Sequence, residues 1–172
     1  CSKSVDMILT VNGIPLVALE LKNQLTGQSV TNAKLQWQND RDTRELVFQF
    51  NTRVLVYFCV DLYDVYMTTK LNGKSTFFLP LNQGSNGAGH DGGKGNPSTT
   101  DKDFITSYLW EDVLRKDSMM DIFQKFLHLQ RQEEKIYKDD GEIEIKEKQT
   151  LIFPRFHQLH VVRNLIADVK QN

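Results

Sequence analysis

The sequence predicts an α/β fold in which helices flank a mixed β-sheet. Two runs of β-favouring residues, 5–11 and 14–21, are separated by Asn12-Gly13, a strong signal for a hairpin turn. A third run, 53–60, carries almost no polar side chain, as expected of a strand covered on both faces. Residues 29–41 are rich in helix formers. We therefore expect a sheet with a central second strand and at least one helix packed on it.

The middle of the chain predicts a second hairpin followed by a loop. Residues 64–69 and 75–81 flank 71–74, which contains another Asn-Gly pair. Residues 83–103 hold most of the glycines and few apolar side chains, so we expect a mobile loop there. A phosphate-binding loop is excluded in this segment, because no strand leads into the glycines and no Gly-Lys-Ser/Thr appears.

Helical spacing of apolar residues returns in the C-terminal part of the chain. It predicts helices over 104–116 and 118–131, whose Met and Phe side chains are typical of packing rather than of a cofactor site. Residues 132–149 are dominated by Glu, Lys and Asp, which indicates a solvated connector. Residues 154–170 fit one amphipathic helix.

Length and composition fit one domain of ordinary size, or one domain with an appendage. Of the 172 residues, 40% are hydrophobic and 25% are charged, which are globular values. A formal net charge of -1 excludes an overall basic surface, so any contact with nucleic acid must be local or shared with other parts of an assembly. No apolar stretch reaches the length of a membrane span, so we expect a cytoplasmic location and no membrane partner.

Cysteine and histidine usage indicates a reducing compartment and no zinc site. Two cysteines cannot form a disulfide framework, and Cys59 lies inside the third strand, where a buried and inert thiol is expected. The four histidines lack a zinc-binding arrangement. Because the chain begins with Cys1 and enters a strand almost at once, we expect it to be a piece of a longer polypeptide.

Asp6, Glu20 and Lys22 form the one group of residues that is arranged for chemistry. Side chains alternate across a strand, so Glu20 and Lys22 share a face. A two-residue hairpin loop would pair Asp6 with Leu19 and place the two acids on opposite faces. A three-residue loop over 12–14 with a bulge would pair Asp6 with Glu20. We predict that register, or a compensating bulge near Asp6.

Paired carboxylates at this spacing indicate a metal site. Two adjacent carboxylates repel each other unless a cation lies between them, and Mg²⁺ prefers oxygen ligands. Asp6 and Glu20 would bind the ion, and the Leu21 backbone carbonyl would be a third protein ligand. Lys22 would orient the attacking water and offset charge on a phosphorane, which predicts metal-dependent phosphodiester hydrolysis. The alternative is that Glu-x-Lys is the polar side of a half-exposed strand, although this strand is otherwise apolar.

The segment 5–22 closely resembles the nuclease motif in the restriction (R) subunit of type I restriction-modification enzymes. The resemblance extends to 32–41, 108–114 and 153–158. It implies a restriction-endonuclease-like fold of the PD-(D/E)xK class, with the catalytic Asp, Glu and Lys at Asp6, Glu20 and Lys22. It also implies a nuclease domain over 1–131, a charged linker over 132–149 and the start of a helicase-like motor domain over 150–172.

The resemblance implies roles for further residues. Relatives carry a Gln-x-x-x-Tyr pattern on the helix after the Lys, in which Gln36 matches the supporting Gln and Asp40 stands where the Tyr is expected. Gln158 matches a residue that contacts the adenine of ATP in the motor, which would lie beyond Asn172. ATP would act only in the full-length protein, where it drives translocation along double-stranded DNA. The methyltransferase and specificity subunits would be partners.

The leading hypothesis is therefore a Mg²⁺-dependent type I site-specific deoxyribonuclease module. The rival is a non-cutting coupling or DNA-binding module whose acid pair is structural, and a stand-alone resolvase-like nuclease is a third option. The geometry of the acids distinguishes the first two. A cutting enzyme should bring Asp6, Glu20 and Lys22 to one metal-sized space, whereas a structural acid would be salt-bridged to Arg or Lys with no open side.

Overall fold

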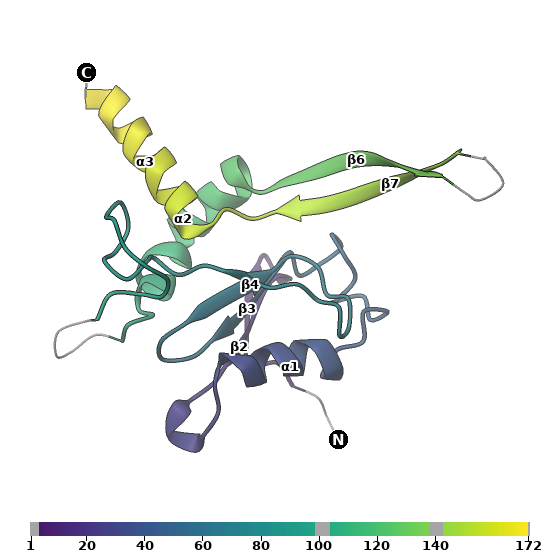
Figure 1. Ribbon diagram of the computed structural model, residues 1–172, viewed down its shortest axis with the longest axis horizontal. Coiled ribbons are helices and arrows are strands. Elements are labelled where there is room, and N and C mark those ends of the chain that lie inside the picture. Colours follow the sequence, from purple (N-terminus) through teal and green to yellow (C-terminus); the bar gives the residue numbers. More distant parts are fainter. Residues whose placement is uncertain (1–3, 99–103, 138–142, 172) are drawn as a thin grey trace.

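A five-stranded mixed sheet forms the body of the computed structural model, which describes residues 4–98, 104–137 and 143–171 (Figure 1). The strand order is β1-β2-β3-β4-β5; β2 and β3 are parallel and the other neighbours are antiparallel. The strands are β1 (Met7–Val11), β2 (Ile14–Leu21), β3 (Val56–Val60), β4 (Val65–Thr68) and β5 (Leu79–Pro80). The predicted α/β class with a mixed sheet and a central second strand is confirmed, whereas the restriction-endonuclease-like fold stays a prediction.

Helices cover both faces of this sheet. The helix α1 (Val30–Asp40), preceded by the short 3-10 turn η1 (Gln24–Thr26), lies on one face. The π-helical turns η2 (Leu109–Val113) and η3 (Ile122–Phe126), with α2 (Lys116–Asp121) and α3 (Phe156–Gln171), lie on the other side. No helix of the described residues is long and apolar enough to cross a membrane.

Two apolar cores follow from the alternation of side chains along β2 and β3. Val17 and Leu19 pack in a core that includes Leu109, Ile122 and Phe156. On the opposite face, a second core consists mainly of residues from β2, α1 and β3, and its buried members are Ala18, Val30, Ala33, Trp37, Phe48, Val54, Tyr57, Cys59 and Leu71. Every residue of β3 is buried, as its apolar sequence predicts, and burial raises the pKa of the Cys59 thiol.

The β1-β2 hairpin reaches the predicted register by a different route. Asn12 and Gly13 both have positive φ, of 50° and 80°, so the loop has two residues and Val11 pairs with Ile14. The predicted three-residue loop is wrong, because Asn tolerates the left-handed conformation that this turn requires. A bulge then leaves Leu16 unpaired, and beyond it Met7 pairs with Leu19. The bulge restores the register that places Asp6 beside Glu20.

The polar groups at the end of β3 fix the start of α1. The Asp61 carboxylate accepts a hydrogen bond from the backbone N–H of Val30 at 2.8 Å, and its other oxygen accepts from Tyr63 and Asp64 at 2.9 and 2.8 Å. Asn32 accepts from the Ser29 backbone N–H at 2.9 Å. The Trp37 indole donates to the Phe58 carbonyl at 3.1 Å, which ties the middle of the helix to β3.

The second hairpin and the glycine-rich loop are only partly as predicted. Met67 of β4 pairs with Leu79 of β5, but β5 has two residues and the Asn-Gly pair lies within a long connection. Residues 83–98 form neither helix nor strand, and the Gly84 N–H donates to the Gly95 carbonyl at 2.8 Å. The mobility of the loop stays a prediction, and its residues 99–103 lie outside the described part.

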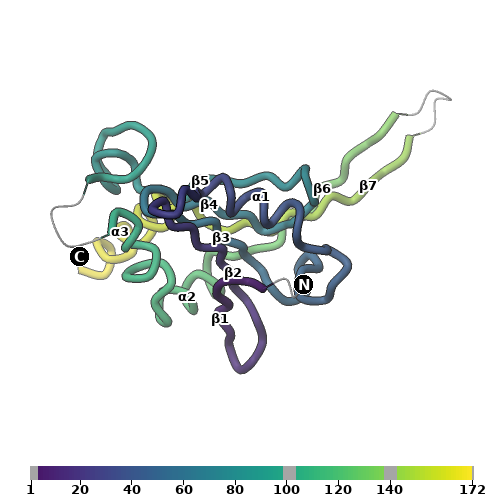
Figure 2. The backbone as a smooth tube through the Cα atoms, turned by 90° about the horizontal axis from the view of Figure 1, so that it is seen from below, coloured from purple at the N-terminus to yellow at the C-terminus, as the bar shows by residue number. Residues whose placement is uncertain are grey.

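Two predictions about the segment after α2 are wrong. The helix predicted over 118–131 ends at Phe126, and the connector predicted over 132–149 is instead a two-stranded ribbon of β6 (His128–Tyr137) and β7 (Ile143–Ile152). The ribbon projects from the sheet in both views (Figures 1 and 2). Glu134 lies opposite Lys146, and Arg131 is ion-paired with Glu147 at 3.6 Å across the strands, which favours the ribbon, whereas Glu133 opposite Glu147 does not. The predicted domain boundary after Arg131 falls inside β6, and residues 138–142 lie outside the described part.

The C-terminal helix is confirmed, and its first turn belongs to the core of the sheet. Phe156 and Leu159 are buried with Tyr108 and Leu109, and the Phe156 and Tyr108 rings meet edge to face at 5.0 Å. The start of α3 thus packs on the sheet, whereas several apolar residues further along the helix are exposed. The assignment of residues 150–172 to a motor domain stays a prediction.

Substituting Asp61→Ala should destabilise the fold by about 2–3 kcal/mol, because it leaves the N–H groups of Val30, Tyr63 and Asp64 without their acceptor. Urea unfolding followed by circular dichroism measures this. Asp42→Ala is the control, since Asp42 pairs with a largely exposed Arg44, and it should leave the midpoint nearly unchanged. Equal midpoints for both variants would contradict the role of Asp61.

Candidate functional site

The four predicted site residues Asp6, Glu20, Lys22 and Gln36 meet at the C-terminal end of β2. The Lys22 Nζ lies 3.8 Å from Asp6 Oδ2 and 3.8 Å from Glu20 Oε2. It donates a hydrogen bond to Gln36 Oε1 at 2.6 Å. The structure therefore brings together an acid pair, an amine and an amide: Glu20 lies in β2, Gln36 lies in α1, and Asp6 and Lys22 adjoin β1 and β2.

Backbone contacts hold these side chains in place. The Lys22 N–H donates to the Val60 carbonyl at 2.8 Å, which continues the β2-β3 ladder one residue past the end of β2. The Leu21 N–H donates to Asp6 Oδ2 at 2.8 Å, so the Asp6 carboxylate is attached to the end of the neighbouring strand. The backbone at the end of β2 thus fixes Lys22 and Asp6 relative to each other.

Glu20 is a carboxylate buried inside the sheet. Its side chain has no solvent exposure, and one oxygen, Oε1, accepts a hydrogen bond from Arg41. The other oxygen, Oε2, has no hydrogen-bond partner. Burial raises the pKa of Glu20 to about 7; the Arg41 hydrogen bond opposes this rise and the nearby Asp6 charge adds to it.

Arg41 is the residue of the site that the sequence interpretation missed. Its guanidinium donates to Glu20 and, at 2.6 Å, to the backbone carbonyl of Ser4, two residues before Asp6. Its Cζ atom lies 5.5 Å from the centre of the Trp37 ring. One signal was available, because an acid on an otherwise apolar strand needs a cation and Arg41 ends the predicted helix 29–41.

Glu20 matches the description of a structural acid, because both of its oxygens face a cation and its side chain has no solvent exposure. Oε1 is ion-paired with Arg41, and Oε2 lies 3.8 Å from the Lys22 amine. Oε2 nevertheless accepts no hydrogen bond, and Asp6 faces the same amine at 3.8 Å. Arg41 therefore holds Glu20 in one orientation while Oε2 keeps its capacity to accept a bond.

The donor set fits a hard divalent cation that also binds water and substrate. An unpartnered buried carboxylate oxygen beside a second carboxylate is suited to Mg²⁺, which keeps several of its waters. Among the described residues, no group of three or more His, Cys, Asp or Glu side chains could hold a metal ion. An ion bound here would have only Asp6 and Glu20 as acidic side-chain ligands, and the Leu21 carbonyl, water or phosphate would fill the remaining positions.

Asp40 and Gln158, to which the family resemblance also drew attention, form no hydrogen bond or ion pair with the acid pair. Asp40 is exposed and lines, with Lys22 and Gln36, a polar hollow of 270 Å³ on the outer side of α1. Gln158 accepts a hydrogen bond from the Arg155 N–H at 2.9 Å and so caps the start of α3. A contact between Gln158 and adenine stays a prediction.

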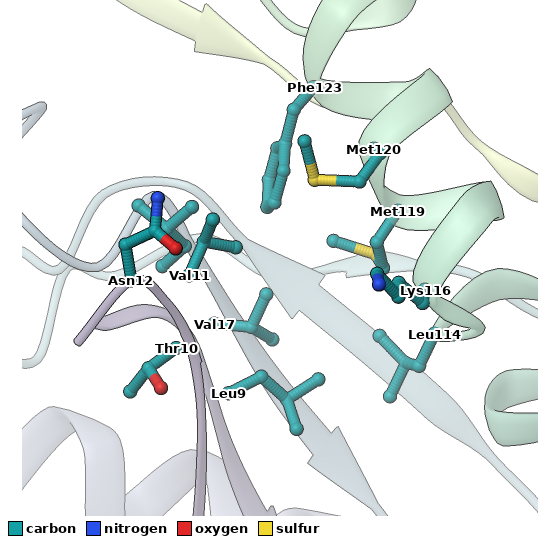
Figure 3. A pocket seen from close by; sticks show the side chains of 11 residues that line it. Leu9, Thr10, Val11, Asn12, Val17, Leu114, Lys116, Met119, Met120 and Phe123 are labelled. Carbon is teal, nitrogen blue, oxygen red and sulfur yellow. The ribbon is translucent and has the colours of Figure 1, made fainter. Parts of the chain in front are cut away.

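A separate apolar pocket lies on the opposite face of β2 from Glu20. It has a volume of 360 Å³ and is bounded by the β1-β2 hairpin and by α2 and η3. Figure 3 shows Met119, Met120 and Phe123 directed towards Val11 and Val17. Its lining includes none of the acids at the end of β2, so the chemistry lies elsewhere.

Residues 2–76 match the family model described as Type I restriction enzyme R protein N terminus. The match contains β1, β2, α1, β3 and β4, and with them all five residues of the site. The resemblance to the R subunit is confirmed over this segment. Searches of curated proteins and of solved structures found no significant match to the chain.

The stability of the protein should fall as the pH rises from about 4.5 to about 7, because Glu20 keeps its proton in the folded state over this range. The stabilisation that comes from protonated Glu20 is complete below pH 4.5 and is lost as the pH rises past about 7. Glu20→Gln should remove this component, worth roughly 1–3 kcal/mol. Urea unfolding at a series of pH values tests this, and parallel pH profiles for the two proteins would contradict it.

The substitution Arg41→Met should destabilise a protein with the native Glu20 more than one that already carries Glu20→Gln. Only in the first case does a buried acid lose its cation. A double-mutant cycle measured by urea unfolding at neutral pH should give a coupling of about 1–3 kcal/mol. Arg44→Met, which removes a surface guanidinium paired with Asp42, is the control and should show no coupling to Glu20. Additive effects of Arg41→Met and Glu20→Gln would refute the pairing.

Proposed function

We propose that this chain, whose residues 2–76 match the family model of type I restriction enzyme R protein N termini, is the module that cleaves double-stranded DNA in a restriction enzyme. The proposed reaction is Mg²⁺-dependent hydrolysis of phosphodiester bonds. One observation carries the proposal: Asp6 Oδ2 and the Glu20 Oε2 that accepts no hydrogen bond each lie 3.8 Å from the Lys22 amine at the end of β2.

In this proposal Lys22 is the residue that acts on the reacting phosphate and water. Gln36 accepts one of its N–H groups, which leaves the others to hold the attacking water and to neutralise charge on the phosphorane. Asp6 and Glu20 would hold the metal ion, which supplies a polarised water and a further positive charge when bound. Arg41 acts through Glu20 as a positioning residue.

The charge balance of the site predicts that metal and DNA bind together. With all groups ionised, the two negative charges of Asp6 and Glu20 already balance the positive charges of Lys22 and Arg41. A divalent ion therefore brings uncompensated positive charge, which a phosphate of the DNA neutralises. The neutral site suits a module that receives its DNA from elsewhere, as does the formal net charge of -1.

In the whole enzyme, the DNA would be delivered by an ATP-driven motor. The methyltransferase and specificity subunits would then provide recognition of the target. The rival function, a non-cutting module with a structural acid pair, is favoured by one specific observation, the ion pair of Arg41 with Glu20. The Glu20 Oε2, which accepts no hydrogen bond, and the convergence of Asp6 on Lys22 favour cleavage over this rival.

Glu20→Ala and Lys22→Ala should each reduce DNA cleavage by the assembled enzyme by roughly 10²-fold or more, because each removes a group that stabilises the transition state. ATP-dependent translocation should continue in both variants. Cleavage is followed on circular DNA with Mg²⁺, and chelation of the metal should stop it.

The chain provides a matched control for this experiment. Glu144 and Lys146 have the same Glu-x-Lys spacing on the strand β7, where their charged atoms lie 3.7 Å apart on the exposed ribbon. Glu144→Ala and Lys146→Ala should cleave DNA at the wild-type rate. Cleavage that persists in Glu20→Ala and in Lys22→Ala would establish the non-cutting alternative for this site.

A further inference from the structure

A second hollow, of 200 Å³, lies at the same end of the sheet as the proposed catalytic site. It opens at the C-terminal ends of β2 and β3, and Lys22 lines it as well as the polar hollow on α1. The other lining residues are Leu21, Val60, Asp61, Leu62, Phe104, Thr106 and Trp110. A substrate that reaches Lys22 therefore passes directly beside this hollow.

Two exposed aromatic side chains form the outer wall of the hollow. Phe104 is 61% exposed and Trp110 is 45% exposed, and their rings meet edge to face with centres 6.2 Å apart. Trp110 lies in the π-helical turn η2, whose flanking Leu109 and Val113 are buried in the core. The turn is thus anchored on one side while it presents the indole on the other.

The polar groups of the hollow are already hydrogen-bonded within the protein. Both carboxylate oxygens of Asp61 accept N–H groups, and the Thr106 hydroxyl donates to the Asp61 backbone carbonyl at 3.1 Å. Asp112, on the same turn as Trp110, is ion-paired with Arg163 at 3.3 Å. The hollow therefore offers apolar and aromatic surface, with Lys22 at its border.

We propose that this hollow binds an unpaired nucleobase of the DNA beside the cleaved phosphate, stacked on Trp110 and flanked by Phe104. The inference rests on the proposed function, because it places the phosphate at Lys22. A nucleotide joined to that phosphate reaches the adjacent aromatic surface, and every base has a face that can stack. Asp61 already accepts N–H groups on both carboxylate oxygens and Thr106 is buried, so neither reads a base edge and the contact is independent of sequence.

An unpaired base is required because bases within a duplex are stacked on each other and do not present their faces. The cleaved strand must therefore be locally open at the site. An apolar segment of a partner protein is the other kind of occupant that such a surface could take, and the experiment below distinguishes the two.

Tryptophan fluorescence of the 172-residue chain provides the test. The chain has two tryptophans, and Trp37 has no solvent exposure, so quenching by an added oligonucleotide reports on Trp110. An oligothymidylate of roughly ten nucleotides, without metal, should quench the fluorescence, and a blunt duplex should not. Trp110→Ala should weaken binding of the oligothymidylate roughly tenfold, measured by fluorescence anisotropy of a labelled strand, whereas Trp110→Phe should bind close to wild type.

Phe104→Ala should also weaken binding, and Phe77→Ala is its control because Phe77 is an exposed phenylalanine outside the hollow. Equal affinity of Trp110→Ala and wild type for the oligothymidylate, or equal quenching by the blunt duplex, would overturn the inference and leave a protein partner as the occupant. The fluorescence assay does not depend on cleavage. If the oligothymidylate quenches Trp110 but cleavage by the assembled enzyme does not depend on Glu20 and Lys22, only the proposed function is refuted. If cleavage depends on these residues but Trp110 is not quenched, only this inference is refuted.

Discussion

The burial of the Glu20 carboxylate inside an apolar sheet is the constraint on which the rest of the site depends. A buried carboxylate is costly unless a cation and hydrogen bonds accompany it. Arg41 supplies that cation at the end of α1, and Lys22 lies on the other side of the carboxylate. Gln36 lies in α1 and Arg41 directly follows it, so the attachment of this helix to β3 through Asp61 and Trp37 determines the geometry of the site.

This arrangement is not explained by stability. Replacing a buried ion pair by apolar residues of similar volume often leaves a protein equally or more stable, so Glu20 and Arg41 are a poor way to strengthen this sheet. Polar groups that break the local pattern of a core occur mainly at functional sites. The Glu144 and Lys146 pair illustrates the contrast, since the same spacing on an exposed strand produces only a surface contact. Burial and the convergence of Asp6 separate the two pairs.

The sheet, α1, α3 and the convergence of Asp6, Glu20 and Lys22 could be predicted from alternation and turn signals, and Gln36 from the family resemblance. The predictions that were wrong concern features that depend on tertiary contacts. Asn12 and Gly13 permit either loop length, so the sequence could not place the bulge at Leu16. The Glu and Lys residues of 132–149 resemble a solvated connector, because the ribbon is stabilised by pairs between strands that composition does not reveal. Arg41 was missed because its partner is distant in sequence.

The parallel pairing of β2 and β3 explains why the acid pair and the aromatic hollow lie together. Ligands of α/β sheets bind at the carboxyl ends of parallel strands, where successive loops leave side chains and backbone groups free. Here β2 ends at Leu21 and Lys22, and β3 ends at Val60 and Asp61. One end of this strand pair thus carries charge on the side of α1 and aromatic surface on the side of η2. Lys22 lines the hollow on each side, so in the proposed function a DNA strand that crosses this end of the sheet would meet the phosphate chemistry and the stacking surface at the same residue.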